Sequence, residues 1–91
     1  MKIFSWNDEK NVVLKSDRQV CFEDVVISTE IGLLLDIMEH PNQEKYQGQK
    51  NLVVQIDHYV YLVPFVENDN EVFLKTIIPS RKATRSYLRG K

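Results

Sequence analysis

The stretch that decides the fold is LVVQIDHYVYLVPFVENDNEVFLKTII, residues 52–78. It contains three runs rich in β-branched and aromatic residues, which are typical of strands, and polar turn residues separate these runs. We expect strands at Leu52–Ile56, Tyr59–Val66 and Val72–Ile78. Asp57 and His58 form a two-residue hairpin turn between the first two strands, because Asp tolerates a positive φ. The stretch therefore predicts an antiparallel meander.

The middle strand, Tyr59–Val66, is apolar on both of its faces. A strand of this kind is covered on both sides, so we expect it inside the sheet with the other two strands of the meander flanking it. Pro64 conflicts with this position because proline has no N–H to give to the ladder. A bulge, or a partner strand that stops short of Pro64, would reconcile the two observations.

Two helices and a further strand are expected before the meander. The first helix is capped by Asn7 or Asp8 and ends near Arg18, and the second spans Phe22–Glu30. Leu33–Met38 then reads as a strand. The side chains that we expect to face inward are Val12, Val13 and Leu14 in the first helix and Phe22, Val25 and Val26 in the second.

Length and composition indicate a single domain, residues 1–91, of the globular α+β class. Two N-terminal helices pack on an antiparallel sheet of about four strands, and a short basic helix follows. The chain has one cysteine, which excludes an internal disulfide and fits a reducing cytoplasm. No apolar run is long enough for a signal peptide or a membrane span, so a cytoplasmic protein without membrane contact is expected.

The charge of the chain is unevenly distributed. Residues 75–91 carry six of the 12 Lys and Arg residues and none of the 13 carboxylates. The remaining 74 residues therefore hold six cations and 13 anions, which gives them a charge of about −7, although the whole chain is near −1. Such an asymmetry between parts of a chain points to nucleic acid or to an acidic partner.

The basic segment also carries the signals of a helix over residues 81–88. Ser80 is a suitable N-cap, and Arg81, Arg85 and Arg89 fall on one stripe of the helix. Cations so spaced repel one another, and a cation at a helix N-terminus opposes the helix dipole. A bound polyanion reverses the sign of both effects. The alternative is a basic helix face that contacts only solvent.

No metal or triad motif occurs, so we expect neither a metal site nor a cofactor. The residues that remain for chemistry lie in or near a polar loop, Glu39–Lys50, and in the basic segment: His40, Lys45, Tyr46, Lys75, Arg81 and Tyr87. RNA can be cleaved without metal because its 2′-OH is the nucleophile. The protein then supplies a base, cations for the charge on phosphorus, and an acid for the leaving oxygen.

Two segments of the chain resemble BrnT-type toxins. FSWNDEK at residues 4–10 and VCFED at residues 20–24 resemble the family's F-x-W-D-x-x-K and V-S-F-E-E opening. KTIIPSRKATR at residues 75–85 resembles its R-I-I-S-A-R-x-A-T-R segment. Together the two matches cover about a third of the chain. The chain departs from the family pattern at Asp17 and Gln19, where a Lys and a Gly are usual, and at Asn7, where Asp is usual.

The resemblance implies a RelE-like toxin of a type II toxin–antitoxin pair. Such a protein has a compact α+β fold, is a metal-independent endoribonuclease that inhibits translation, and is neutralised by a cognate antitoxin encoded by the adjacent gene. Its substrate is RNA, free or on the ribosome. The candidate catalytic residues are Arg81, carried over from the S-A-R position, with His40, Lys75 and Tyr87. The candidate RNA-binding residues are Lys45, Lys82, Arg85 and Arg89.

Two other functions fit the charge pattern. One is a non-catalytic interaction module whose basic helix binds an acidic partner. The other is a small DNA-binding regulator, which is disfavoured because no helix-turn-helix or ribbon-helix-helix pattern is apparent.

Overall fold

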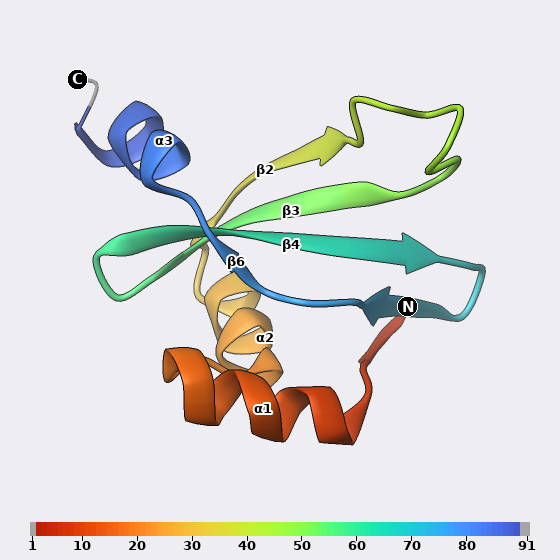
Figure 1. Cartoon of the computed structure of the whole chain (residues 1–91), viewed down its shortest axis with the longest axis horizontal. Coiled ribbons are helices and arrows are strands. Elements are labelled where there is room, and N and C mark those ends of the chain that lie inside the picture. Colours follow the sequence, from red (N-terminus) through yellow and green to blue (C-terminus); the bar gives the residue numbers. More distant parts are fainter. Residues whose placement is uncertain (1, 90–91) are drawn as a thin grey trace.

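The meander forms the centre of a six-stranded sheet in a computed structural model that describes residues 2–89, with the side chain of Arg89 outside the description. The elements in chain order are β1 (Ile3–Ser5), α1 (Asp8–Arg18), α2 (Phe22–Glu30), β2 (Leu34–Glu39), β3 (Lys50–Ile56), β4 (Tyr59–Glu67), β5 (Glu71–Leu74), β6 (Ile78–Pro79), α3 (Arg81–Thr84) and η1 (Arg85–Arg89). The strand order is β1-β5-β4-β3-β2, and β6 also pairs with β4. The α+β class is confirmed (Figure 1).

Strand β4 lies inside the sheet between β3 and β5, as its two-sided apolar pattern predicts. The conflict at Pro64 is resolved by a partner that stops short. β5 ends at Leu74, and the Lys75 N–H donates to the Pro64 carbonyl at 2.8 Å. This carbonyl points to the same edge as the missing Pro64 N–H, so no ladder donor is lost there. The chain then returns to β4 as β6, beside Tyr61 and Leu62.

The sheet differs from the predicted one in two ways. The prediction of a single strand over Val72–Ile78 was wrong, because the chain leaves β4 after Lys75 and pairs with it again only at Ile78. β1 is an additional strand that pairs in parallel with β5, so the sheet is not wholly antiparallel. Three residues are too few to show a period, and the partner of β1 lies almost seventy residues away in the chain.

Helix α2 packs on the sheet as predicted, and it is the main helical contribution to the core. Phe22 and Val25 are fully buried, whereas Val26 is half-buried. The Phe22 ring stacks on Trp6 with ring centroids 5.6 Å apart. Phe22, Val25 and Trp6 meet Leu52, Val54, Ile56, Val63, Phe65, Leu74 and Ile77 in one cluster.

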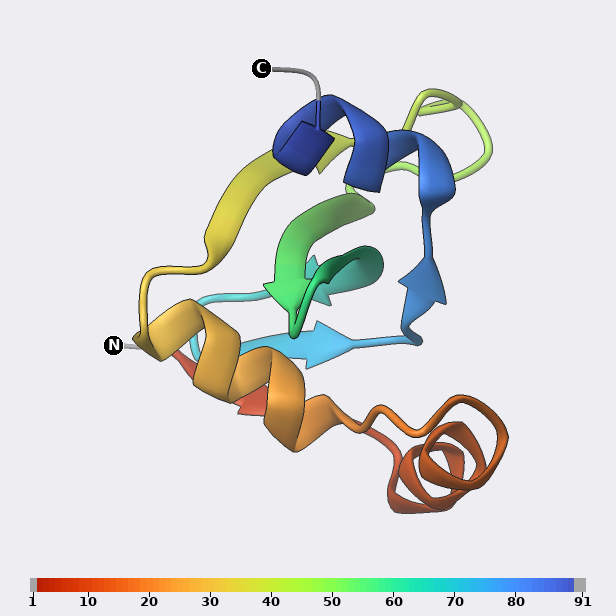
Figure 2. The ribbon, with the colours of Figure 1, turned by 90° about the vertical axis from the view of Figure 1, so that its left-hand side faces the viewer.

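Helix α1 begins at the predicted cap, where the Asn7 side chain accepts from the Lys10 N–H at 2.9 Å. The expectation that Val12 and Val13 face inward was wrong, because they are 69% and 50% exposed. Leu14 is the one buried residue of this helix. α1 lies at the margin of the fold and reaches the core through Leu14 (Figure 2).

The basic helix, α3 continued by the π-helical turn η1, lies on the opposite side of the sheet from α1 and α2 (Figures 1 and 2). Ser80 is its N-cap and accepts from the Ala83 N–H at 3.0 Å, as predicted. Thr84 fastens the helix to β4. Its hydroxyl accepts from the buried Val60 N–H at 2.9 Å and donates to the Ser80 carbonyl at 2.8 Å.

Replacing Thr84 by valine keeps the shape of the side chain and removes both hydrogen bonds. The Val60 N–H is then buried without a partner, so we expect Thr84→Val to lower the free energy of unfolding by about 1–3 kcal/mol. Thr84→Ser keeps the hydroxyl and is the matched control. Urea unfolding followed by circular dichroism measures both variants. A Thr84→Val protein as stable as the parent would show that this anchor contributes nothing.

Candidate functional site

The open face is the surface of the sheet opposite α1 and α2. Side chains on adjacent strands that are paired in register share a face, and alternate residues along one strand share it too. Met38 pairs with Asn51, and Asp36 and Leu62 both pair with Val53, so these five residues belong to this face. Ladder pairing continues past β2, because the His40 N–H donates to the Gln49 carbonyl at 3.0 Å. The open face therefore extends from Asp36 to His40, about 13 Å along the strand.

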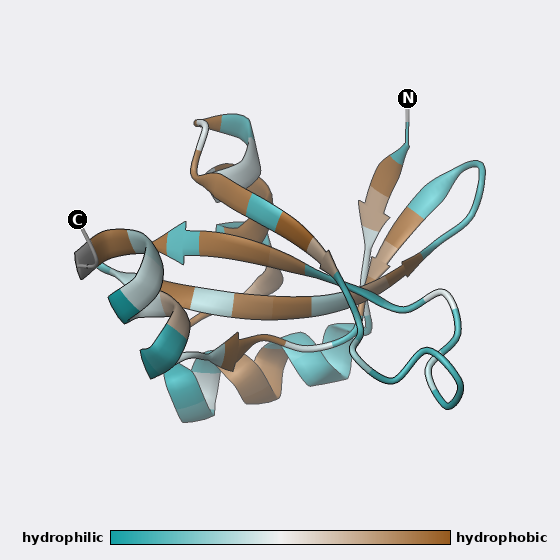
Figure 3. Ribbon diagram, turned by 90° about the horizontal axis from the view of Figure 1, so that it is seen from above, coloured by the Kyte–Doolittle hydropathy of each residue, from teal (hydrophilic) through white to brown (hydrophobic). Residues whose placement is uncertain are grey.

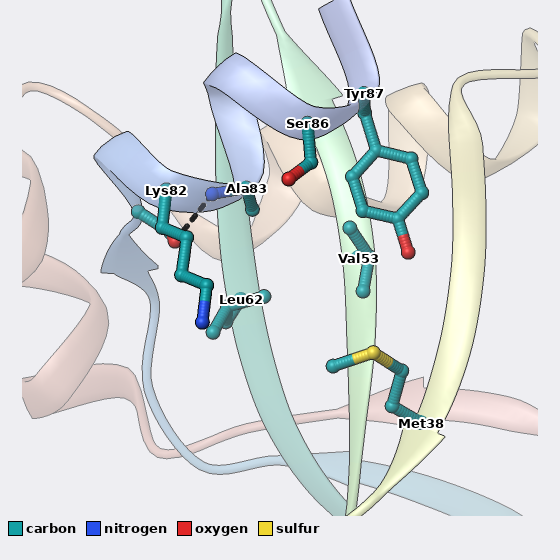
Figure 4. A pocket seen from close by; sticks show the side chains of 8 residues that line it. Met38, Val53, Leu62, Lys82, Ala83, Ser86 and Tyr87 are labelled. Atoms are coloured by element: carbon teal, nitrogen blue, oxygen red, sulfur yellow. Dashed lines mark hydrogen bonds between the residues drawn. The ribbon is translucent and has the colours of Figure 1, made fainter. Parts of the chain in front are cut away.

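A cavity of about 340 Å³ lies between the open face and the basic helix. Its floor is apolar and consists of Met38, Val53 and Leu62. The wall contributed by the helix and its cap consists of Ser80, Lys82, Ala83, Ser86 and Tyr87. Figure 4 shows the tyrosine ring over Val53 and the lysine side chain reaching down beside Leu62. An apolar cavity with a few convergent polar groups is the usual form of a ligand site.

Tyr87 is held in place by a hydrogen bond to a residue of β2. Its hydroxyl donates to the Asp36 carboxylate at 2.8 Å, which joins η1 to β2. This hydrogen bond is the main cause that raises the pKa of the Tyr87 phenol, with loss of hydration a smaller one. The phenol therefore remains a proton donor at neutral pH. Because its pKa is raised in the folded state, the stabilisation from this bond is complete at neutral pH and is lost as the pH rises through that pKa.

Titration of the four tyrosines tests this contact. The hydrogen bond to Asp36 raises the pKa of Tyr87, and burial raises the pKa of Tyr61. Asp36→Asn removes the carboxylate charge and should lower the pKa of Tyr87 toward its ordinary value without moving that of Tyr61. Tyrosinate absorbance near 295 nm follows the titration, and Tyr87→Phe identifies the step. An unchanged titration in Asp36→Asn would exclude the contact.

The far end of the open face carries a second group of predicted residues. The His40 ring packs against Tyr46 with ring centroids 4.2 Å apart. Lys45 Nζ lies 5.4 Å from the centroid of the Tyr46 ring. Lys75 Nζ donates to Gln49 Oε1 at 3.1 Å, which places this cation beside the start of β3. In Figure 3 the loop of residues 40–49 is teal, in contrast with the brown strands.

The structure thus places five of the predicted site residues in two groups on one face. Tyr87 and Lys82 line the cavity, whereas His40, Lys45 and Lys75 lie at the loop end. Arg81 and Arg85 are exposed on the helix and do not line the cavity. Arg89 ends the helix, and its side chain lies outside the described residues.

Sequence reasoning missed three residues of this site: Asp36, Met38 and Ser86. Asp36 and Met38 lie within a predicted strand, and only the turn of the chain that brings η1 back over β2 gives them a role. Ser86 follows Lys82 at i+4 and so shares its side of the helix, which is the one signal that the sequence offered. Asn51, also on the open face, has a buried Oδ1 without a hydrogen-bond partner among residues 2–89.

Neither a metal-binding cluster nor a membrane-spanning helix is found in the described part of the chain. Within residues 2–89 no three His, Cys, Asp or Glu side chains are grouped to hold an ion. No helix in this range is long and apolar enough to cross a membrane. Comparisons with protein-family models, with curated proteins and with solved structures found no match.

Proposed function

We propose that this chain is the toxin of a type II toxin–antitoxin pair, a RelE-like endoribonuclease that needs no metal and inhibits translation in the cytoplasm. The observation that carries the proposal is the cavity between the basic helix and the sheet. There a cation, Lys82, shares the wall with a phenol, Tyr87, that is hydrogen-bonded to a carboxylate, Asp36. These are the three kinds of group that cleavage by the 2′-OH requires.

The proposed reaction uses these groups in turn. Asp36 takes the proton of the 2′-OH, and the 2′-oxygen forms a bond to phosphorus. Lys82 stabilises the charge that develops on the phosphoryl oxygens. The P–O5′ bond breaks, and Tyr87 gives its proton to the leaving oxygen. The proton held by Asp36 then passes to Tyr87 through the hydrogen bond that joins them, which restores both groups. The products are a 2′,3′-cyclic phosphate and a 5′-hydroxyl.

The other predicted cations bind the flanking phosphates in this account. Arg81 and Arg85 are exposed along the helix, and Lys75 and Lys45 lie at the loop end of the open face. The BrnT resemblance assigns the catalytic cation to Arg81, whereas the lining of the cavity favours its neighbour Lys82. We therefore propose Lys82 as the cation nearest the reacting phosphate and Arg81 as a binding residue at the rim.

The proposed partner is an antitoxin encoded by the adjacent gene. Its acidic or amphipathic segment covers the basic helix and so blocks the cavity. A partner that binds only the folded toxin also stabilises it by mass action. The same helix would serve a non-catalytic interaction module, which is the second candidate function.

Induced expression tests the proposed function in cells. We expect growth arrest when this chain is expressed by itself, and normal growth when the adjacent gene is expressed with it. The double variant Lys82→Ala/Tyr87→Phe lacks both proposed cavity groups and is the control. Growth arrest by this variant would mean that toxicity does not depend on cleavage. Unchanged growth with soluble parent protein would contradict the toxin proposal and favour the interaction module.

A further inference from the structure

We propose that the Tyr46–His40 pair is a stacking platform for an unpaired base of single-stranded RNA, a second subsite on the open face beyond the cavity. This inference rests on the proposed function for its ligand class, but it concerns binding and not cleavage. It gives the loop of residues 40–49 a role that neither the BrnT resemblance nor the cavity assigns.

The loop that carries the platform is internally fixed. The Asn42 N–H donates to His40 Nδ1 at 3.0 Å, and the Tyr46 N–H donates to the Asn42 carbonyl at 3.0 Å. Gln43 Nε2 donates to the His40 carbonyl at 2.7 Å, and the Gln49 N–H donates to the Tyr46 carbonyl at 3.0 Å. The two rings are thereby held together before any ligand arrives, which lowers the entropy lost on binding.

Tyr46 is more exposed than its partner His40. It is 37% exposed, while His40 beneath it is half-buried. Tyr46 is the one aromatic residue among the exposed large apolar side chains of the described residues. Its neighbours along the loop are the polar Lys45 and Gln47. The structure thus presents an aromatic surface of the size of one base, backed by a second ring.

The two lysines near the platform, and not the net charge of its loop, which also holds Glu44, favour RNA over a protein side chain as its occupant. Lys45 Nζ lies 5.4 Å from the Tyr46 ring centroid, and its flexible stem can turn to a phosphate instead. Lys75 lies beside the same loop, because its Nζ donates to Gln49 Oε1. Stacking surfaces combined with cations that follow the backbone are the usual means of binding single strands. His40 is two residues from Met38 along the open face, so one strand of RNA can occupy the platform and the cavity together.

Binding of a short fluorescein-labelled 2′-O-methyl oligonucleotide, measured by anisotropy over a series of salt concentrations, tests the platform. This probe cannot be cleaved through its 2′-oxygen. We expect Tyr46→Ala to weaken binding about 10- to 100-fold with an unchanged salt slope. Tyr46→Phe and Tyr46→Trp should bind like the parent. Lys45→Ala should lower the salt slope by about 0.7, as for one lost phosphate contact. A duplex probe, whose bases are paired, should not distinguish Tyr46→Ala from the parent.

Val12→Ala, an exposed change on α1, is the matched control, and thermal melts show that each variant folds. Equal affinity of Tyr46→Ala and the parent, or no binding of the parent at low salt, would overturn the platform whatever the cleavage assay shows. Weak binding by Tyr46→Ala together with no cleavage of ordinary RNA by the parent would support the platform while contradicting the proposed catalysis.

Discussion

Phe22→Ala is expected to lower the free energy of unfolding by about 3–5 kcal/mol. Phe22 has no exposed surface, stacks on Trp6 and lies in the cluster that joins α2 to the sheet. Its removal leaves a cavity that the strands cannot close, and Trp6 loses its stacking partner. A domain of this length has about 5–14 kcal/mol of stability in total, so a loss of this size removes a large share of it.

Urea unfolding measures the loss as a shift of the midpoint at constant slope. Ile27→Ala, on the same helix but 52% exposed, is the control and should change stability by less than about 0.5 kcal/mol. The loss of stability in Phe22→Leu should lie between the losses in Phe22→Ala and Ile27→Ala. A loss below about 1 kcal/mol in Phe22→Ala would mean that α2 does not pack on the sheet as described.

Lys82→Ala is expected to slow cleavage of bound RNA about a hundredfold or more, which corresponds to about 3 kcal/mol of transition-state stabilisation. The reason is its place on the wall of the cavity beside Tyr87, where charge develops on phosphorus in the proposed reaction. Single-turnover cleavage at saturating protein measures the rate without the contribution of binding.

Arg81→Ala and Arg85→Ala are the matched controls, since both remove an exposed cation from the same helix. They should cleave bound RNA at nearly the parent rate but bind it with a salt slope lower by about 0.7 each. The opposite result, with Arg81→Ala inactive and Lys82→Ala active, would contradict the placing of the reaction in the cavity and support the assignment that the BrnT resemblance implies.

Local chemistry predicted most of the fold. The hairpin turn lies at Asp57, whose φ is +58°, and α2 begins and ends at Phe22 and Glu30 as expected. These boundaries depend on turn residues and caps, which act within a few positions of the chain. β1 and the inner face of α1 depend instead on distant partners. Ile3–Ser5 is a strand only because β5 lies beside it, and α1 turns Leu14, not Val12, toward the core.

The candidate site was less predictable for the same reason. The basic helix and its cap follow from residues 80–89, but the contact between Tyr87 and Asp36 joins positions 51 residues apart. The choice between Arg81 and Lys82 depends on how the helix is rotated over the sheet. That rotation is fixed by Thr84 and Val60, through a side chain to backbone bond that no sequence pattern announces.

Cleavage of RNA by the purified chain, with analysis of the new ends, is the most direct test of the proposed function. We predict fragments with 2′,3′-cyclic phosphate and 5′-hydroxyl ends, formed equally well in the presence of a metal chelator and prevented by the co-purified product of the adjacent gene. The substrate is offered both free and on translating ribosomes. No cleavage in either form by folded protein, or cleavage that the chelator abolishes, would contradict a metal-independent ribonuclease.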